Sequence, residues 1–260
     1  MHRFILFFTA LLMSGFSSFA QKMDLFDNLI YTSSGDSLPY RLLKPVNPQS
    51  FDKFPLVIFL HGAGERGNDN EAQIKHIREL FLDEKYRGKY PCYLVAPQCP
   101  KGKWWADFTG NSENATLSKN PSDPMKMVIT LIEKIIVEYP IDESRIYITG
   151  LSMGGYGTWD LIARYPQKFA AAVPICGGGD VKTASQIQHI PLWAFHGAKD
   201  KIVIPSQSRR MIKALQDAGG LPGYSEYPDV EHNSWVYAYR EPHLMHWLFK
   251  QKKGDETASK

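Results

Sequence analysis

One serine in this sequence stands between glycines in a pattern that can make it a nucleophile. Ser152 lies in the stretch GLSMG, directly after the apolar run 145–150 and before a segment with helical spacing. In a sharp strand-to-helix turn, Gly150 and Gly154 remove side chains and lift the serine hydroxyl clear. The G-x-S-x-G pattern alone is weak evidence, because it arises by chance in roughly one chain of this length in ten.

A serine hydroxyl is a poor nucleophile near neutral pH, so this interpretation requires a base and a group that orients the base. Asp200 follows the apolar run 191–197, and His232 follows a later extended segment. Parallel strands bring their carboxyl ends to a common edge, which predicts that Ser152, Asp200 and His232 converge there. Three other carboxylates remain open as the orienting acid: Asp180, Asp229 and Glu231.

Two backbone N–H groups are candidates for holding a negatively charged oxygen. The glycine-rich stretch HGAGERG at 61–67 follows an apolar run, and its glycines let the Ala63 N–H approach a carbonyl oxygen closely. The Met153 N–H lies at the start of the helix that Ser152 precedes. Together they predict an oxyanion hole. The glycine-rich stretches at 61–67 and 177–179 both lack the spacing of a phosphate loop.

The loop between Pro97 and Asp123 is long and carries two adjacent tryptophans, Trp104 and Trp105. Long loops in compact domains are often functional. The two aromatic planes are therefore candidate substrate-binding residues that stack on a sugar ring or a phenolic acid. The alternative, in which both tryptophans pack the loop onto the core, is equally open.

No metal site or organic cofactor is predicted. His243 and His246 have helical i, i+3 spacing, but the sequence offers no third ligand near them, so a surface position is favoured. The serine chemistry described above needs no cofactor of its own.

The elements that must position these residues alternate along the chain. Apolar runs of strand length separate segments with helical periodicity, which predicts an α/β fold with a mostly parallel central sheet and helices on both faces. The predicted strands are 55–62, 92–98, 145–150, 171–177 and 191–197, with an edge strand at 38–45. The predicted helices are 123–139, 158–165, 206–218 and 235–250. Residues 21–260 are expected to form one catalytic domain.

The first twenty residues differ from the rest. Arg3 precedes an apolar run at 4–13 and small residues that end at Ala20, which is typical of a cleaved signal peptide at 1–20. The apolar run is about half as long as the roughly 20 residues of a membrane-spanning helix. Export to a periplasm or the medium is therefore expected, with no stable membrane anchor after cleavage.

Charge and cysteine content narrow the possible partners and cross-links. With 30 basic and 27 acidic residues the chain is nearly balanced, so nucleic acid is not an expected partner. If 92–99 is largely a strand, Cys92 and Cys99 lie about 20 Å apart, too far for a disulfide. A bridge between Cys99 and Cys176 stays open, although three unpaired cysteines are favoured.

Several stretches together resemble one known family. HGAGERG, APQCPKGKWW, GLSMGGYGTWDL, CGGGD and HGAKDKIVIPSQSRRM look like the esterase/peptidase branch of the α/β-hydrolase superfamily, similar to polyhydroxybutyrate-depolymerase-like and feruloyl-esterase-like enzymes. The likeness covers nearly the whole mature chain. Ser152, Asp200 and His232 match that family's triad positions, and HGAG matches its oxyanion loop. The resemblance implies serine-dependent acyl hydrolysis without fixing the acyl group or the alcohol.

Three function classes follow. An exported carboxylesterase that acts on small-molecule or oligosaccharide esters, carbohydrate-linked or phenolic, is the leading hypothesis. A serine peptidase of the prolyl-oligopeptidase type is second, disfavoured because many such enzymes carry a large additional domain for which about 240 mature residues leave no room. A non-catalytic binding protein on the same fold is third, disfavoured because the serine, acid, histidine and oxyanion loop are all present.

Overall fold

The computed structural model describes residues 25–33, 35–46, 48, 52–109 and 115–254. The predicted signal peptide, residues 1–20, lies outside these ranges. Within them, no helix combines the length and the apolar character that crossing a membrane requires.

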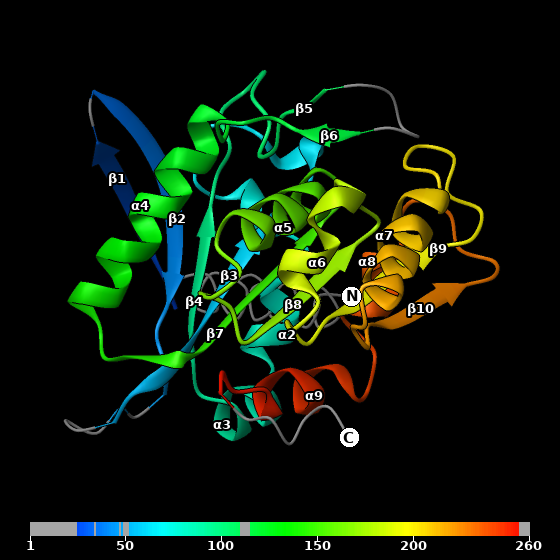
Figure 1. The fold of residues 1–260 in the computed structure, drawn as a ribbon. Coiled ribbons are helices and arrows are strands. Elements are labelled where there is room, and N and C mark those ends of the chain that lie inside the picture. Colours follow the sequence, from blue (N-terminus) through cyan, green and yellow to red (C-terminus); the bar gives the residue numbers. More distant parts are fainter. Residues whose placement is uncertain (1–24, 34, 47, 49–51, 110–114, 255–260) are drawn as a thin grey trace, which may run out of the picture.

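One sheet forms the centre of the molecule, and its strand order is β1-β2-β4-β3-β7-β8-β9-β10. Strand β2 is antiparallel to both of its neighbours, whereas the strands from β4 to β10 in that order are parallel. Figure 1 shows β1 and β10 at the two ends of the sheet. The strands are β1 (Phe26–Ser33), β2 (Asp36–Leu43), β3 (Phe54–Leu60), β4 (Tyr93–Pro97), β7 (Ile141–Leu151), β8 (Ala171–Ile175), β9 (Trp193–Gly197) and β10 (Gly223–Tyr227).

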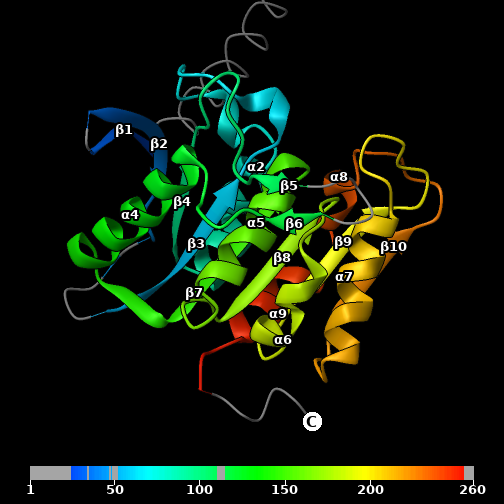
Figure 2. The ribbon, with the colours of Figure 1, turned by 45° about the horizontal axis from the view of Figure 1, so that its top comes forward.

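Helices cover both faces of the sheet, which confirms the predicted fold class (Figure 2). One face packs against α4 (Asp123–Glu138), α5 (Met153–Arg164), α6 (Ala184–Ile187) and α7 (Ser206–Asp217). The other packs against α2 (Arg78–Leu82), α3 (Glu84–Lys89), α8 (Trp235–Ala238) and α9 (Leu244–Lys250). The remaining elements are short: η1 (Ala63–Glu65), η2 (Ala72–Ile74), η3 (Val181–Thr183), and the hairpin strands β5 (Phe108–Thr109) and β6 (Thr116–Leu117).

Strand β3 explains why a continuous apolar run is needed at the centre. All residues of β3 are buried, and their side chains alternate between two separate cores. Leu56, Ile58 and Leu60 belong to the core under α4 and α5, whereas Val57 and Phe59 belong to the core under α2 and α9. A strand that is buried on both faces reads as a run of apolar residues because no position of it faces water.

Three element predictions differ from the structure. The predicted edge strand 38–45 is β2, an inner strand, because β1 pairs along its whole length and forms the edge. The predicted helix 235–250 is two helices, α8 and α9, since Pro242 interrupts the hydrogen-bond pattern between them. Helix α5 begins at Met153 rather than at 158, because the glycines of its first two turns mask the helical signal.

Candidate active site

The turn between β7 and α5 holds Ser152 in a backbone conformation that few non-glycine residues adopt. Its φ is 54° and its ψ is −115°. The Ser152 N–H donates to the Ile175 carbonyl oxygen at 2.9 Å, which fixes the turn to the end of β8. A Cβ atom on Gly154 would lie 1.8 Å from the Leu60 carbonyl oxygen, and one on Gly150 would lie 2.3 Å from that of Gly154. Both glycines are therefore required by close backbone packing.

His232 connects the serine to a carboxylate. Its Nε2 lies 2.9 Å from Ser152 Oγ, and its Nδ1 lies 2.7 Å from Asp200 Oδ2. An ionised carboxylate can only accept, so Nδ1 carries the ring proton and Nε2 is left to accept the serine hydroxyl. The three residues come from separate strand ends, and the fold brings them together as the sequence predicts.

Further hydrogen bonds orient Asp200, whose side chain is completely buried. Its Oδ1 accepts the N–H groups of Ile202 at 2.9 Å and Val203 at 3.0 Å. On the Oδ2 side lies His196 Nε2 at 3.3 Å, which also donates to the Val203 carbonyl oxygen at 2.8 Å. Burial lowers the pKa of His196, so this second histidine is a neutral donor.

Two of the alternative acids have other partners. Asp180 accepts the N–H groups of Leu117 and Lys182, both at 3.0 Å, and so ties the β6 segment to the loop after β8. The Asp229 side chain is 87 % exposed and pairs with Lys199. Asp200 is the carboxylate that contacts His232.

Cys176 lies directly beside this hydrogen-bonded chain. It follows β8 with a φ of 39°, its N–H donates to the Phe195 carbonyl oxygen at 2.8 Å, and its side chain is fully buried. Its Sγ, an Asp200 carboxylate oxygen and a His232 ring nitrogen lie within 4.8 Å of one another. Burial raises the pKa of Cys176 to about 12, so the thiol is neutral and a weak nucleophile. All three cysteines are free and buried.

The buried imidazole of His61 holds the loop after β3 in place. His61 Nε2 accepts the Cys99 N–H at 2.9 Å, and its Nδ1 lies 2.6 Å from the Gly62 carbonyl oxygen. The Trp105 indole N–H donates to the His61 carbonyl oxygen at 3.0 Å. Burial lowers the pKa of His61 to about 4, so the ring is neutral at physiological pH.

Glu65 adds a buried carboxylate to this loop. It is 9 % exposed and lies 3.3 Å from His76 Nε2. Burial alone would raise the pKa of Glu65, but the hydrogen bond and the charge of His76 hold it below its ordinary value. The His76 ring contacts Trp235, and Trp235 in turn meets the His232 ring edge to face, with 5.4 Å between the centroids. Trp235 therefore contacts both His76, the partner of Glu65 in this loop, and His232.

The two predicted oxyanion donors lie on segments that pack together. Helix α5 begins at Met153, so the N–H groups of its first turn have no partner within the helix. A Cβ atom on Gly62, the residue before Ala63, would lie 2.8 Å from the Leu151 side chain. The start of the 61–67 loop therefore lies against the end of β7, beside Ser152.

The two adjacent tryptophans have different environments. Trp105 is completely buried in the core beneath Gly157, so the prediction that it contacts a substrate is wrong. Trp104 is 52 % exposed, and the Arg66 guanidinium lies over its ring at 4.9 Å. Arg66 also donates to the Ala63 carbonyl oxygen at 2.9 Å, which joins Trp104 to the glycine-rich loop.

Sequence reasoning missed three contributors: His196, Cys176 and Arg66. His196 and Cys176 are each next to last in a predicted apolar run, at the edge where parallel strands bring their carboxyl ends, and that position was an available signal. No sequence signal identified Arg66 as a partner of Trp104, because the two residues are brought together by loops.

The comparison with known families decides the affiliation. The sequence profile of the phospholipase/carboxylesterase family matches residues 45–241. The chain belongs to this family. The resemblance to the α/β-hydrolase superfamily is thereby confirmed.

Two relatives show the range of this similarity. A bifunctional acetylxylan esterase/xylanase of Neocallimastix patriciarum is 27 % identical over 191 residues, which are 71 % of this chain and 26 % of that protein. A probable carboxylesterase of Arabidopsis thaliana is 24 % identical over 219 residues, 78 % of this chain and 81 % of that one. The chain thus spans about a quarter of the first relative and most of the second.

A solved structure of a thermostable esterase agrees more closely. It is 41 % identical, superposes with a TM-score of 0.81, and the match covers 88 % of this chain and 64 % of that one. This likeness covers most of the chain, in agreement with the α/β-hydrolase fold.

Proposed function

We propose that this chain is an exported serine carboxylesterase in which Ser152, His232 and Asp200 act as a catalytic triad. The observation that carries the proposal is the hydrogen-bonded chain from Ser152 Oγ through both ring nitrogens of His232 to Asp200. Membership of the phospholipase/carboxylesterase family supports the same reaction class.

The proposed reaction has two halves. His232 Nε2 takes the hydroxyl proton as Ser152 Oγ attacks the ester carbonyl, and Asp200 stabilises the imidazolium that forms. The N–H groups of Met153 and Ala63 hold the developing oxyanion. His232 then gives its proton to the leaving alcohol, and a water molecule activated by the same His232 releases the acid from the acyl-enzyme. No step requires a cofactor.

We assign the substrate to esters in which a carbohydrate supplies the alcohol or a phenolic acid supplies the acyl group. Trp104 offers an exposed aromatic face close to the glycine-rich loop, and Arg66 holds that ring from one side. Aromatic faces bind flat, apolar ring surfaces, and the acetylxylan esterase activity named for the Neocallimastix relative is of this substrate class. Cleavage of a signal peptide at 1–20 would leave 21–260 as one domain outside the cytoplasm, where esterified polysaccharides occur.

A substrate panel tests the proposal. The mature chain, from Gln21 onward, is assayed with an acetylated xylo-oligosaccharide, methyl ferulate, p-nitrophenyl acetate and a peptide anilide, each alongside Ser152→Ala. Ester turnover that disappears in the variant is the expected result. Cleavage of the anilide alone would transfer the proposal to a serine peptidase, and turnover that survives in Ser152→Ala would refute the triad.

The same panel tests the substrate assignment through Trp104→Ala. Loss of a stacking contact of about 1 kcal/mol raises KM for the xylo-oligosaccharide about fivefold. Methyl acetate, which has no ring to stack on Trp104, is added to the panel as the matched control. An equal change for both substrates would mean that Trp104 supports the loop rather than the substrate.

A further inference from the structure

We propose that Cys176, Asp200 and His232 form an inhibitory binding site for a soft divalent cation, with Zn²⁺ as the probe. The Sγ atom, one carboxylate oxygen and one ring nitrogen lie within 4.8 Å of one another. Thiolate, carboxylate and imidazole are three ligand types that zinc accepts. The effect on turnover rests on the proposed function, whereas binding of the ion does not.

The geometry of the three side chains is close to what a tetrahedral ion requires. Zinc bonds of about 2.3 Å to sulfur and about 2.0 Å to nitrogen place those two ligand atoms about 3.5 Å apart. The three ligand atoms lie within 4.8 Å of one another, so they have to move about 1 Å closer together to bind the ion. Side-chain rotations can supply such movements. The His232 and Asp200 side chains also have to separate slightly from their 2.7 Å hydrogen bond.

The charges balance when the ion binds. Cys176 loses its thiol proton to solvent, because a thiol that coordinates a metal is deprotonated. The ion forms bonds to the sulfur, a ring nitrogen of neutral His232 and the carboxylate of Asp200. The thiolate and the carboxylate together cancel the two positive charges, so the occupied site is formally neutral. That neutrality suits a site whose Cys176 and Asp200 side chains are fully buried.

Two hydroxyl groups beside the cluster offer oxygen for a fourth position. Ser234 is completely buried, and its Oγ faces the Cys176 thiol with no other hydrogen-bond partner in the described part of the chain. Ser152 Oγ lies 2.9 Å from His232 Nε2. His232 is 18 % exposed, so an ion reaches the cluster from the substrate side.

Coordination disables the base whichever ring nitrogen binds. An ion on Nε2 occupies the lone pair that would take the serine proton. An ion on Nδ1 displaces the ring proton to Nε2, which then donates and cannot accept. The thiolate also sets the selectivity, since sulfur ligands favour zinc and other soft ions over Mg²⁺ and Ca²⁺.

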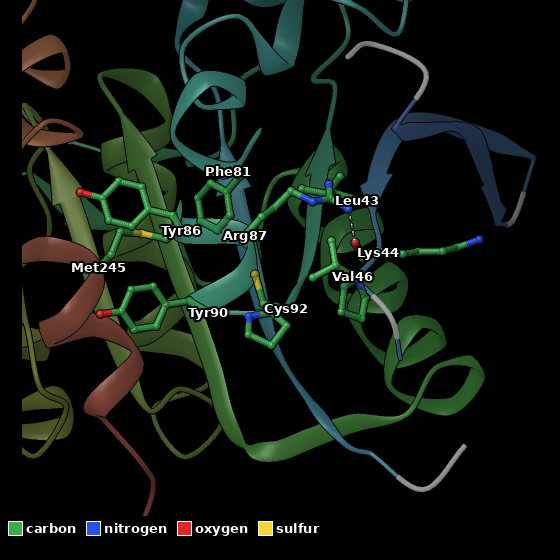
Figure 3. A pocket seen from close by; sticks show the side chains of 11 residues that line it. Leu43, Lys44, Val46, Phe81, Tyr86, Arg87, Tyr90, Cys92 and Met245 are labelled. Carbon is green, nitrogen blue, oxygen red and sulfur yellow. Dashed lines mark hydrogen bonds between the residues drawn. The ribbon is translucent and has the colours of Figure 1, made fainter. Parts of the chain in front are cut away.

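Cys92 provides a matched control within the same chain. It is also buried and free, but it lies at the amino ends of the parallel strands, in a pocket that Arg87 and Met245 also line (Figure 3). The residues that line this pocket include no histidine and no carboxylate. Cys92→Ser therefore removes a comparable thiol without removing a ligand set.

Zinc inhibition of the mature protein is the first test, measured with p-nitrophenyl acetate and reversed with a chelator. Cys176→Ser is expected to raise the half-inhibiting zinc concentration by at least about tenfold, and Cys92→Ser to leave it unchanged. Magnesium at the same concentration is expected to have no effect. Zinc sensitivity that is absent in the wild type, or unchanged in Cys176→Ser, would overturn the proposal.

A second readout does not depend on turnover. Co²⁺ added to Ser152→Ala is expected to give a thiolate-to-cobalt charge-transfer absorption band that is lost in Ser152→Ala/Cys176→Ser and kept in Ser152→Ala/Cys92→Ser. A band that survives without Cys176 would refute the site. Because Ser152→Ala is already inactive under the proposed function, this band reports the metal site even if the esterase proposal fails. Cys176→Ala replaces Cys176→Ser if the latter does not fold.

Discussion

Cys176 and Cys92 are both buried cysteines beside parallel strands, but Cys176 lies where the strands end (the carboxyl edge) and Cys92 where they begin (the amino edge). Their surroundings differ as well. Cys176 follows β8 and lies beside Asp200 and His232. Cys92 precedes β4 and lies beside the cationic Arg87, in a pocket lined mainly by apolar and aromatic side chains (Figure 3). The same residue type therefore has a carboxylate and an imidazole beside it at one end of the strands and neither among the residues that line the pocket at the other.

The difference follows from how the strands end. At the carboxyl edge, turns after β3, β7, β8 and β9 place backbone N–H groups and short polar side chains around one point, Ser152. At the amino edge, a hollow is lined mainly by cations and aromatic rings, among them Lys53, Lys89, Tyr90, Arg145, Phe249 and Lys250. The comparison predicts that substitutions at the two edges differ sharply in their effect on turnover.

The largest predicted difference concerns Ser152 and His232, the proposed nucleophile and base. Ser152→Ala and His232→Ala should each lower kcat on the order of 10⁶-fold, because either loss removes the same proton transfer. The double variant should lose little more than either single variant. Ester hydrolysis under saturating substrate measures all three, and Cys92→Ser at the amino edge is the control that should keep its turnover.

Additive losses would contradict this prediction, since they would mean that Ser152 and His232 act in separate steps. A large loss in Cys92→Ser, with the fold intact by circular dichroism, would contradict the contrast between the two edges.

The next effect concerns Asp200, whose acceptor oxygen fixes the tautomer of His232. Asp200→Asn places an amide that can donate to Nδ1, which leaves the proton on Nε2 and prevents that atom from accepting the serine proton. Turnover should fall by roughly 10⁴-fold while the fold remains. A near-normal rate would transfer the orienting role to Glu231 or another acid, and Asp229→Asn, at an exposed carboxylate, is the matched control.

The fold was predictable because its strongest signals are local. Continuous apolar runs at β3, β7 and β9 announce strands that are buried on both faces, and their alternation with helical segments implies a parallel sheet. Strand β1 was not predicted because it is an edge strand in which, after the buried Phe26, partly buried and exposed residues alternate. The break between α8 and α9 depends on Pro242, a local signal that the apolar pattern on either side concealed.

The site was predictable to the extent that each residue ends an element. Ser152 directly follows β7, and Asp200 lies in the turn just after β9, so topology alone brings them to one edge. The separate roles of Trp104 and Trp105 were not predictable, because neighbouring residues with identical side chains differ only in the direction that the loop gives them. Burial of Trp105 against Gly157 is a tertiary contact that no local pattern announces.

Alanine substitutions of two glycines should change the free energy of unfolding differently at the two edges. Gly154→Ala would place a methyl group 1.8 Å from the Leu60 carbonyl oxygen, so it should cost at least about 4 kcal/mol or prevent folding. At Gly88, in α3 near the amino edge, an added Cβ would meet no described residue within 4 Å apart from its chain neighbours and its own helix backbone. Gly88→Ala should therefore be neutral or stabilise the helix by up to about 1 kcal/mol. Urea unfolding of the two variants measures both values, and similar changes would contradict the close packing at the elbow.

The smallest predicted effect is the loss of folding stability at acid pH that His61, at the carboxyl edge, causes. Burial lowers its pKa from 6.5 to about 4, so the unfolded chain takes up a proton below about pH 6.5 whereas the folded chain resists until about pH 4. The unfolded state thus binds more protons in this window, and stability that is complete above pH 6.5 is lost as the pH falls.

For His61 alone this loss is about 3 kcal/mol between pH 7 and pH 4. His61→Gln keeps an acceptor for the Cys99 N–H but cannot titrate, so its unfolding free energy should fall less than that of the wild type over the same range. Urea titrations at pH 7, 5.5 and 4.5 follow the two curves. Parallel curves would show that the acid sensitivity originates elsewhere, with buried His196 as the next group to replace, because burial lowers its pKa in the same direction.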